Sequence, residues 1–467
     1  MDASSNSISR PRLTLATKLA YGAGDMGSGL TSNLLAFSFL FFLTNVAGLE
    51  LRAAGLVLLI GKIWDAVNDP IVGMLSDRTR SRWGRRYPWM VATGLPFGIT
   101  FLLNWVVPGF TSQWALFTYY VVVSIAFQIF YTTTNLPYST LTAEMTEDYD
   151  ERTELTSFRL AFSLAGAVAI LALGLVVGQL VPNAQRQYQL LGLLGGVISI
   201  ATLYWCVFGT YGHAQRQAAH RGSSLNEMAE PETTGLWQQF RIVFSNRPFL
   251  YVVGIYLFSW LALQITATII PYYVTFWMGA DDYFLAALVV QGAAIPMMFV
   301  CNLLAKRIGK KGLYFLGAGV WTVVQLALFF LQPGQLHIMY GLCLLVSFGV
   351  ATAYVVPWAI LPDVIELDEL NTGKRREGAF YSFMTLLQKM GLAVGIFLVS
   401  LALETSGFDK DALTQPGSAL LAIRFFMGPV PLGLLLAGMV LAYFYPITKA
   451  VHAEILLKLS ERRRASS

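Results

Sequence analysis

Long apolar runs are the feature that most constrains this chain. Mostly apolar stretches of about 18 residues or more recur from near residue 17 to near residue 446, with short polar segments between them. As an α-helix, a stretch of this length crosses a hydrocarbon core of about 30 Å. Only 13% of the 467 residues are charged, whereas a soluble domain carries roughly 25%. The sequence therefore predicts an all-α membrane protein without a soluble domain of useful size.

Twelve runs are long enough to be spans. We expect them at residues 17–46, 53–76, 88–107, 114–141, 156–181, 189–210, 247–277, 283–305, 312–331, 336–362, 378–403 and 419–446. An even number places both termini on one side of the membrane. On that side the connecting segments and tails hold 25 lysines and arginines, against three on the other side: Arg52, Arg186 and Lys410. The positive-inside rule predicts that both termini are cytoplasmic, in a plasma or inner membrane.

The chain also divides into two similar halves. A polar segment at 211–246 separates residues 1–210 from residues 247–467, which end in a predicted cytoplasmic tail. Basic, glycine-containing turns follow the second and the eighth spans, at 73–86 and 302–311. Such repetition is typical of a parallel repeat of six helices. We expect the first turn to act as a conformational loop through Gly73, Asp77, Arg78, Gly84 and Arg85, although the positive-inside rule alone explains its basic residues.

The second predicted span carries charges where a membrane helix is normally apolar. Its centre reads GKIWDAVNDP, residues 61–70. A charge at the bilayer centre costs about 2.5–3.5 kcal/mol on insertion scales, so such residues are functional candidates. Asp65 and Asp69 lie four residues apart, on one helix face with Asn68, and their oxygens suit Na⁺ or a shared proton. An alternative is that Lys62, three residues before Asp65, forms a structural salt bridge with it.

Other ionisable residues are expected at membrane depth. Lys389 has no acid within four positions, so it needs a partner on another helix, and the two acids of the second span are the obvious candidates. A lysine that exchanges with a cation on the same carboxylates would couple the two, which makes Lys389 and Lys62 the candidate coupling residues. Asp25 and Arg159 are candidates for solute contact, although Arg159 can also extend to the membrane surface.

Polar residues without charge complete the candidate solute site. The fourth span ends in a polar run, residues 131–138, whose hydroxyl and amide groups either join helices or contact solute. Together with the two charged candidates, the set predicted to bind solute is Asp25, Asn135, Arg159, Gln264 and Gln388.

These motifs resemble the glycoside–pentoside–hexuronide:cation symporter family of the major facilitator superfamily. The resemblance rests on WDAVNDPIVG at 64–73, RTRSRWGRR at 78–86, NLPY at 135–138, DERT at 150–153 and GKRREG at 373–378. It covers about residues 17–446. It implies the major facilitator fold, alternating access, and symport of a sugar, glycoside or sugar acid with Na⁺, Li⁺ or H⁺. It requires no other cofactor.

The resemblance also implies roles for single residues. Asp65 and Asp69 match the family's cation-binding aspartates, with Asn68 and Thr132 as further oxygen donors, and Lys389 matches a lysine beside that site. Arg159 matches an arginine near the solute cavity. The family's melibiose permease has sugar-binding acids in spans 1 and 4 and a tryptophan in span 4. The matching positions here are Gly29, Asn135 and Ser139, so galactoside specificity does not carry over.

A chain with these motifs is also compatible with functions other than sugar symport. Animal lysophospholipid symporters belong to the same family and have a similar NLPY motif, so an amphiphilic solute is an alternative. A membrane sensor that does not transport is a second alternative. An enzyme is not expected, because the sequence shows no nucleophile–base or metal-ligand spacing and its four histidines fall in loops or near helix ends. The expected partners are a small solute and the lipid bilayer, with no nucleic acid and no obligate protein partner.

Overall fold

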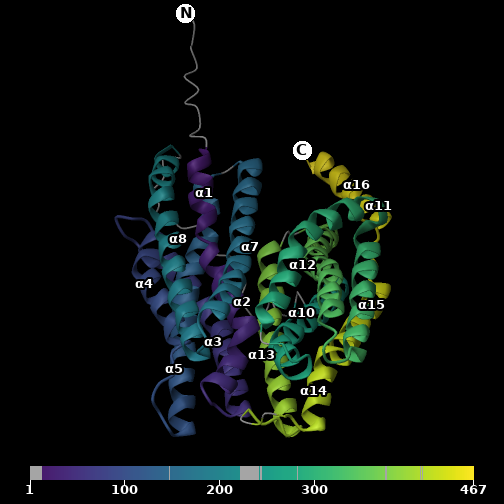
Figure 1. Ribbon diagram of the computed structural model, residues 1–467. Helices are drawn as coiled ribbons and strands as arrows, with labels where there is room; N and C mark the ends of the chain where they lie inside the picture. The colour runs from purple at the N-terminus through teal and green to yellow at the C-terminus, as the bar shows by residue number, and fades with distance from the viewer. Residues whose placement is uncertain are drawn as a thin grey trace, which may run out of the picture. The chain divides into compact units, whose positions relative to one another are not determined.

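The computed structural model describes residues 13–146, 148–220, 241, 244–280, 282–373, 376–410, 412 and 414–466. Every regular element in this part of the chain is a helix (Figure 1). In chain order these are α1 (Leu15–Ala23), α2 (Met26–Phe41), η1 (Phe42–Val46), α3 (Leu51–Arg78), α4 (Tyr87–Leu103), α5 (Gln113–Thr140), α6 (Thr142–Met145), α7 (Tyr149–Leu180), α8 (Ala184–His220), α10 (Arg247–Tyr272), η2 (Tyr273–Trp277), α11 (Tyr283–Phe330), α12 (Leu336–Thr372), α13 (Glu377–Thr405), α14 (Gly417–Met427), α15 (Pro429–Phe444) and α16 (Lys449–Ser466).

All twelve predicted spans fall on these helices, which confirms the all-α class. The first span is α1, α2 and η1 in succession, and the last is α14 with α15. The 48-residue α11 contains the eighth and ninth spans, because Gly309 has non-helical backbone angles (φ 77°, ψ 166°) and breaks it. By length and hydropathy alone, nine helices of the described residues qualify as membrane spans. Three more spans bring the number to twelve. The break in α11 divides that helix into two spans, the 17-residue α4 is a shorter apolar helix, and α3 is a span that carries internal charges.

Two helices continue well beyond the spans predicted on them. The tenth span was expected to end at residue 362, but α12 continues to Thr372 and is closed by Gly373 in a left-handed conformation (φ 70°). Helical geometry does not stop where hydropathy falls, because a helix continues until a cap residue ends its hydrogen bonds. The extension places Asp363, Glu366 and Asp368 on a helix. In the same way α8 continues to His220, beyond the predicted 210, and residues 221–240 of the predicted linker lie outside the described part.

The first and seventh predicted spans end alike. The π-helical turns η1 and η2 follow α2 and α10. Each is followed by a glycine with positive φ, Gly48 (78°) and Gly279 (68°). The two basic turns have such a glycine as well, Gly84 (81°) and Gly309 (77°). Only glycine adopts these angles without strain, so the repeated glycines show where the chain needs the same sharp reversal in each half.

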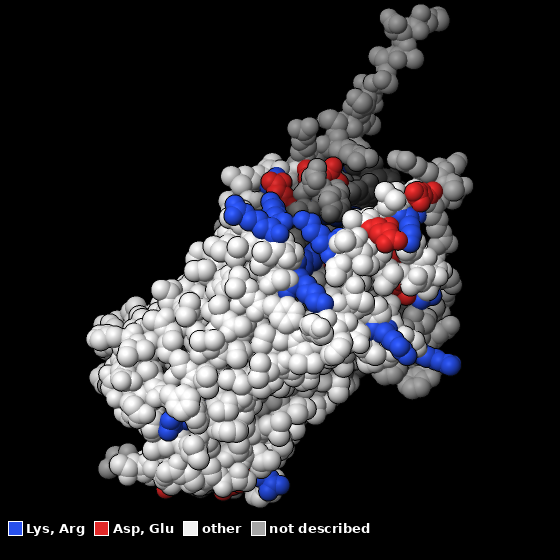
Figure 2. Space-filling model, turned by 90° about the vertical axis from the view of Figure 1, so that its right-hand side faces the viewer, with Lys and Arg blue, Asp and Glu red and all other residues white. Residues whose placement is uncertain are grey.

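The chain forms two compact units. The first consists of Met1–Leu34, Val67–Gly109 and Thr118–Pro231, and the second of Leu35–Ala66, Phe110–Phe117 and Glu232–Ser467. The first unit has a buried hydrophobic core that includes Tyr21, Tyr87, Tyr138 and Cys206. On the face drawn in Figure 2, charged side chains gather toward one end and leave a broad, almost uncharged belt below them. An uncharged belt of this kind suits the hydrocarbon layer of a membrane.

Candidate cation and solute sites

The α3 acids are held at the middle of a long helix. Asp65 and Asn68 are buried, at 2% and 5% exposure, and Asp69 is half-buried. Pro70 follows inside the same helix. Proline removes one backbone donor from the preceding turn, so a backbone carbonyl next to the acids loses its helical partner. The local sequence therefore concentrates oxygen acceptors on one short stretch of α3.

Asp65 pairs with a lysine from α13. Lys389 Nζ lies 3.1 Å from Asp65 Oδ1, within the second unit. Lys62 Nζ lies 3.9 Å from Asp65 Oδ2, which is longer than a hydrogen bond. The structure thus brings together the acid and the distant lysine that the sequence predicted to meet. The neighbouring lysine on α3 is the weaker partner.

The next acid faces α5, within the first unit. Thr132 Oγ1 donates to Asp69 Oδ1 at 3.2 Å, and Asn68 Nδ2 donates to the Gln128 carbonyl at 3.3 Å. Thr132 is 2% exposed. The predicted oxygen donors Asp69 and Thr132 are therefore in contact, while the Asn68 amide also joins α3 to α5.

Asp25 and Arg159 form an ion pair in the first unit. Asp25 lies in the break between α1 and α2, is 5% exposed, and accepts a hydrogen bond from Arg159 Nε on α7 at 3.2 Å. The guanidinium also lies over the Tyr138 ring, 5.7 Å from its centre. The Arg159 side chain retains 31% exposure. Arg159 is therefore the more exposed half of the pair.

Asn135 belongs to a neighbouring polar cluster. Its Nδ2 donates to Ser28 Oγ at 3.1 Å, and that hydroxyl lies 2.8 Å from the hydroxyl of Tyr131. A cavity of about 10 Å³ lies among these side chains, which is room for about one water molecule. These contacts join α2 to α5. Joining helices was one of the two roles predicted for the polar run at residues 131–138; contact with solute was the other.

Gly29 lies where the first predicted span has no room for a side chain. A Cβ atom built on Gly29 would overlap the Ser163 carbonyl oxygen of α7. Because the two backbones pack directly against each other, no side chain fits there without separating α2 from α7. Asp25, one helical turn earlier, is the acid present in this part of the first unit.

Gln264 and Gln388 lie in the second unit. Both are half-buried, on α10 and α13. The five predicted solute residues are therefore divided between the units. The structure joins Asp25 to Arg159 and places Asn135 in a separate cluster of the first unit.

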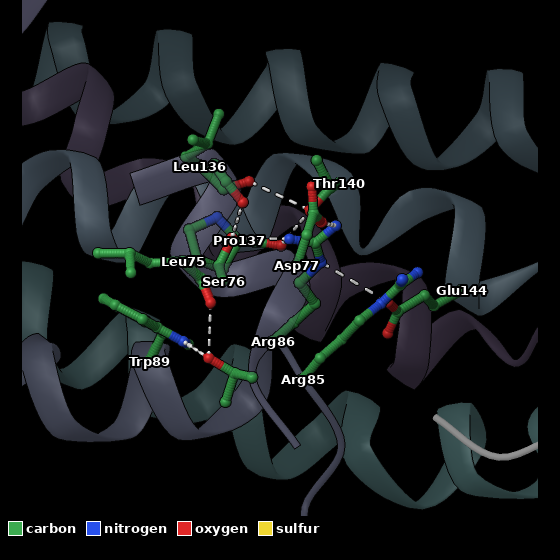
Figure 3. A network of polar contacts seen from close by, with 12 residues as sticks. Leu75, Ser76, Asp77, Arg85, Arg86, Trp89, Leu136, Pro137, Thr140 and Glu144 are labelled. Atoms are coloured by element: carbon green, nitrogen blue, oxygen red, sulfur yellow. Dashed lines mark hydrogen bonds and ion pairs between the residues drawn. The ribbon is translucent and has the colours of Figure 1, made fainter. Parts of the chain in front are cut away.

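Arg86, a buried arginine, holds the loop between α3 and α4 through several polar contacts (Figure 3). Arg86 is 7% exposed. It contacts Asp77, donates to Ser76 Oγ at 2.8 Å, and lies 3.7 Å from Glu144 of α6. Arg85 donates to the same Glu144 oxygen at 2.8 Å.

The loop residues predicted from the sequence include Arg85 but neither Arg86 nor Glu144. A glutamate in an otherwise weakly charged stretch, 141–146, was the available signal. Of the other predicted loop residues, Gly84 provides the reversal and Gly73 accepts from Ser76 Oγ at 3.1 Å. Arg78 is exposed at the end of α3.

In the second unit, hydrogen bonds join η1 to the end of α10 and the end of α2 to the start of α11. The hydroxyls of Thr44 and Tyr272 lie 2.7 Å apart, and Tyr283 donates to Ser38 Oγ at 2.8 Å. Lys410 Nζ donates to the Gly48 carbonyl at 2.6 Å. These contacts lie at the helix ends predicted to be extracellular.

One group of side chains in the described residues has the composition of a metal site. Ligand atoms of Asp363, Glu366 and His452 lie within 4.8 Å of one another. The ammonium of Lys310, however, already donates to both Asp363 oxygens, at 2.7 and 2.9 Å. His452 Nε2 and Glu366 Oε2 are 2.7 Å apart, whereas two ligands of a tetrahedral zinc lie about 3.3 Å apart, from bonds of about 2.0 Å. The group is an ion-pair network rather than a metal centre.

A family model described as "MFS/sugar transport protein" matches residues 20–449. The chain belongs to this family of membrane transporters. The predicted membership among the glycoside–cation symporters of the major facilitator superfamily is thereby confirmed, and with it a multi-pass membrane location.

Curated relatives cover nearly the whole chain. The uncharacterized symporter sll1374 of Synechocystis sp. is 44% identical, over 98% of this chain and 99% of its own. The sodium-dependent lysophosphatidylcholine symporter 1 of Gallus gallus is 26% identical, over 98% and 92%. The putative glycoside/cation symporter YagG of Escherichia coli is 25% identical, over 97% and 96%. These relatives are symporters rather than enzymes.

Solved structures show the fold. The nucleoside transporter NupG superposes with a TM-score of 0.62 at 14% identity, over 91% of this chain and 98% of that one. A D-xylose–proton symporter superposes with a TM-score of 0.63 at 16% identity, over 93% and 98%. The major facilitator fold expected from the sequence is therefore shown.

Proposed function

We propose that this protein is a cation-coupled symporter that takes up a small sugar-like solute with Na⁺, Li⁺ or H⁺ by alternating access. The observation that carries the proposal is the contact between Lys389 and Asp65. Both residues lie within predicted spans, and each would be costly in a membrane without the other.

The pair provides a physical means of coupling. With no cation bound, the ammonium of Lys389 neutralises Asp65. An arriving cation is attracted to the same carboxylate and competes with the lysine. Asn68, Asp69 and Thr132, all in the first unit, are the other predicted oxygen donors. Once a cation neutralises the acids, Lys389 is released and changes the charge available to the solute. Binding of one ligand then alters the affinity for the other, as coupled transport requires.

The polar residues favour a hydroxylated solute. Every hydroxyl group that leaves water needs a hydrogen-bond partner, and candidates are available in both units: Asp25, Asn135, Arg159, Gln264 and Gln388. The partly exposed guanidinium of Arg159, held by Asp25, can exchange this carboxylate for an acidic group of the solute. A sugar acid therefore fits the charged residues at least as well as a neutral glycoside. The glycoside/cation name of one relative supports this class.

An amphiphilic solute is the second candidate, supported by the similarity to a lysophosphatidylcholine symporter. Such a solute needs a pocket for the headgroup and an apolar opening for the chain. A sensor that binds solute without moving it is the remaining alternative. The number of polar and charged candidates leads us to favour the sugar-like class.

Uptake into proteoliposomes tests the proposal. Labelled monosaccharides, disaccharides, uronic acids and lysophosphatidylcholine are offered with an inward Na⁺ gradient, an inward H⁺ gradient or neither. We expect a sugar or sugar acid to accumulate above equilibrium only with a cation gradient. Accumulation of lysophosphatidylcholine alone would assign the amphiphile class, and binding without accumulation of any solute would identify a sensor.

A further inference from the structure

The C-terminal helix α16 is attached to α12 by a charged contact. His452 Nε2 lies 2.7 Å from Glu366 Oε2 and 3.3 Å from Asp363 Oδ1. Below this contact, Ile455 and Leu459 of the same helix are buried, at 4% and 5% exposure. One imidazole nitrogen therefore faces two carboxylates at the edge of an apolar contact, all within the second unit.

Lys310 of α11 completes the network. Its ammonium donates to both oxygens of Asp363 and to the Ala359 carbonyl at 2.8 Å, so its three donors are satisfied. Asp363 is 5% exposed, and Glu366 and His452 are half-buried. Two carboxylates then face one permanent positive charge. A protonated His452 balances the network, whereas a neutral His452 leaves one negative charge in excess.

Burial raises the pKa of the Asp363 carboxyl, and the hydrogen bonds and charge of Lys310 oppose this effect. Tyr445, a neighbour of Asp363, is buried. Lys449 donates to the Lys306 carbonyl at 3.3 Å. Lysine, tyrosine and ionised carboxylates do not ordinarily titrate between pH 6 and pH 8, whereas histidine does.

Two further groups lie nearby. Lys311 donates to the Tyr443 carbonyl at 2.7 Å, and Glu454 pairs with Lys458 at 2.6 Å on the exposed side of α16. The pKa of Glu454 is lowered and that of Lys458 is raised by their mutual hydrogen bond, so this pair keeps its charges in this pH range. Among the described groups named around this contact, His452 is therefore the one expected to respond.

We infer that His452 is a proton-binding site that regulates the docking of α16 onto α12. The imidazolium bridges Glu366 and Asp363 and holds the helix in place. Loss of its proton removes one of two attractive charges and leaves a single neutral N–H donor for two carboxylates. Docking is therefore tight at low pH and loosens as the pH rises through the range in which histidine titrates. On the predicted topology the site faces the cytoplasm, so it responds to cytosolic pH, and it depends on neither the identity of the solute nor that of the coupled cation.

Amide hydrogen exchange of the full-length protein tests this inference. Exchange at residues 449–461 is measured at pH 6.0, 7.0 and 8.0 in lipid nanodiscs and converted to protection factors, which removes the intrinsic pH dependence of exchange. We expect protection of α16 to fall about three- to tenfold between pH 6.0 and pH 8.0, the effect of about one partly buried charge pair. Equal protection at all three values would overturn the inference.

Two variants separate charge from packing. His452→Gln keeps an N–H donor but cannot be protonated, so its protection should not vary with pH and should stay at or below the high-pH level of the natural protein. His452→Lys keeps a positive charge across the range, so its protection should also be constant but higher. His337→Gln is the matched control, because His337 is exposed at the opposite end of α12, and it should keep the natural response. A natural pH response in His452→Gln would contradict the assignment.

Discussion

The Lys389 ammonium lies 3.1 Å from a carboxylate oxygen of Asp65, and the two side chains retain 20% and 3% exposure. Two residues far apart in the sequence thus neutralise each other on helices α3 and α13. Removal of either partner leaves an unpaired charge in a predicted membrane span. Variants of the two residues therefore test whether the pair couples cation to solute.

Asp65→Asn and Asp69→Asn should each abolish accumulation of solute against a gradient while leaving expression near normal. The amide has almost the volume of the carboxylate but offers no charge to a cation. Cation-driven uptake into proteoliposomes measures the effect, and solute exchange without a gradient is the control for folding. Concentrative uptake by both variants would refute the assignment of the α3 acids to the cation site.

Lys389→Ala should stall or uncouple transport, because it leaves Asp65 without its closest cation and favours a cation or proton that stays bound. Lys389→Arg should restore little, since a planar guanidinium cannot replace a compact ammonium. Uptake at several cation concentrations distinguishes stalling from uncoupling. Natural uptake in Lys389→Ala would show that the pair is only structural.

Gly29→Ala should destabilise the protein by at least about 1–3 kcal/mol, the usual cost of overpacking. Its Cβ would overlap the backbone of α7, where little can move. Gly292→Ala, on α11 with nothing within 4 Å, is the matched control and should be neutral or slightly stabilising. The apparent unfolding temperature in detergent compares them, and equal temperatures would show that the two helices separate easily.

Arg86→Gln should lower stability more than Arg78→Gln. Arg86 is buried against Asp77, Ser76 and Glu144, so its loss leaves polar groups without a charge partner, at up to about 3 kcal/mol. Arg78 is exposed, and its replacement should cost less than about 0.5 kcal/mol. Apparent unfolding temperatures again provide the comparison. If the two variants are equally stable, the network of Figure 3 does not hold this loop in place.

Tyr272→Phe should loosen the contact between α2 and α10. It removes the 2.7 Å hydrogen bond to Thr44 but keeps the ring packing on Phe41 and Phe408. The expected cost is about 0.5–1.5 kcal/mol, which corresponds to about two- to tenfold faster labelling of Ser38→Cys by an impermeant thiol reagent.

The matched control for this contact is Tyr443→Phe, because Tyr443 is 70% exposed. The three native cysteines are buried and should not contribute to labelling. Unchanged labelling in Tyr272→Phe would mean that the hydrogen bond does not hold these helix ends together.

The sequence by itself determined the membrane class, the number of spans, the repeated turns and the family. The length of apolar runs, basic loops and glycines in turns are local properties of the sequence. In a membrane they are enough to predict helical spans, because backbone polar groups must be satisfied within each helix. The acids of α3 were equally visible, since Asp65 and Asp69 interrupt an apolar run.

Only the tertiary structure decided which distant side chains meet. In the structure Lys389 lies nearer to Asp65 than Lys62 does. Asp25 pairs with Arg159, and Glu144 lies beside Arg86. It also made His452, which the sequence placed in a loop or near a helix end, part of a network with Asp363 on an extended α12. Sequence spacing specifies neighbours along one helix, but contacts between helices depend on packing and on where each helix ends, and neither is encoded in a single run of residues.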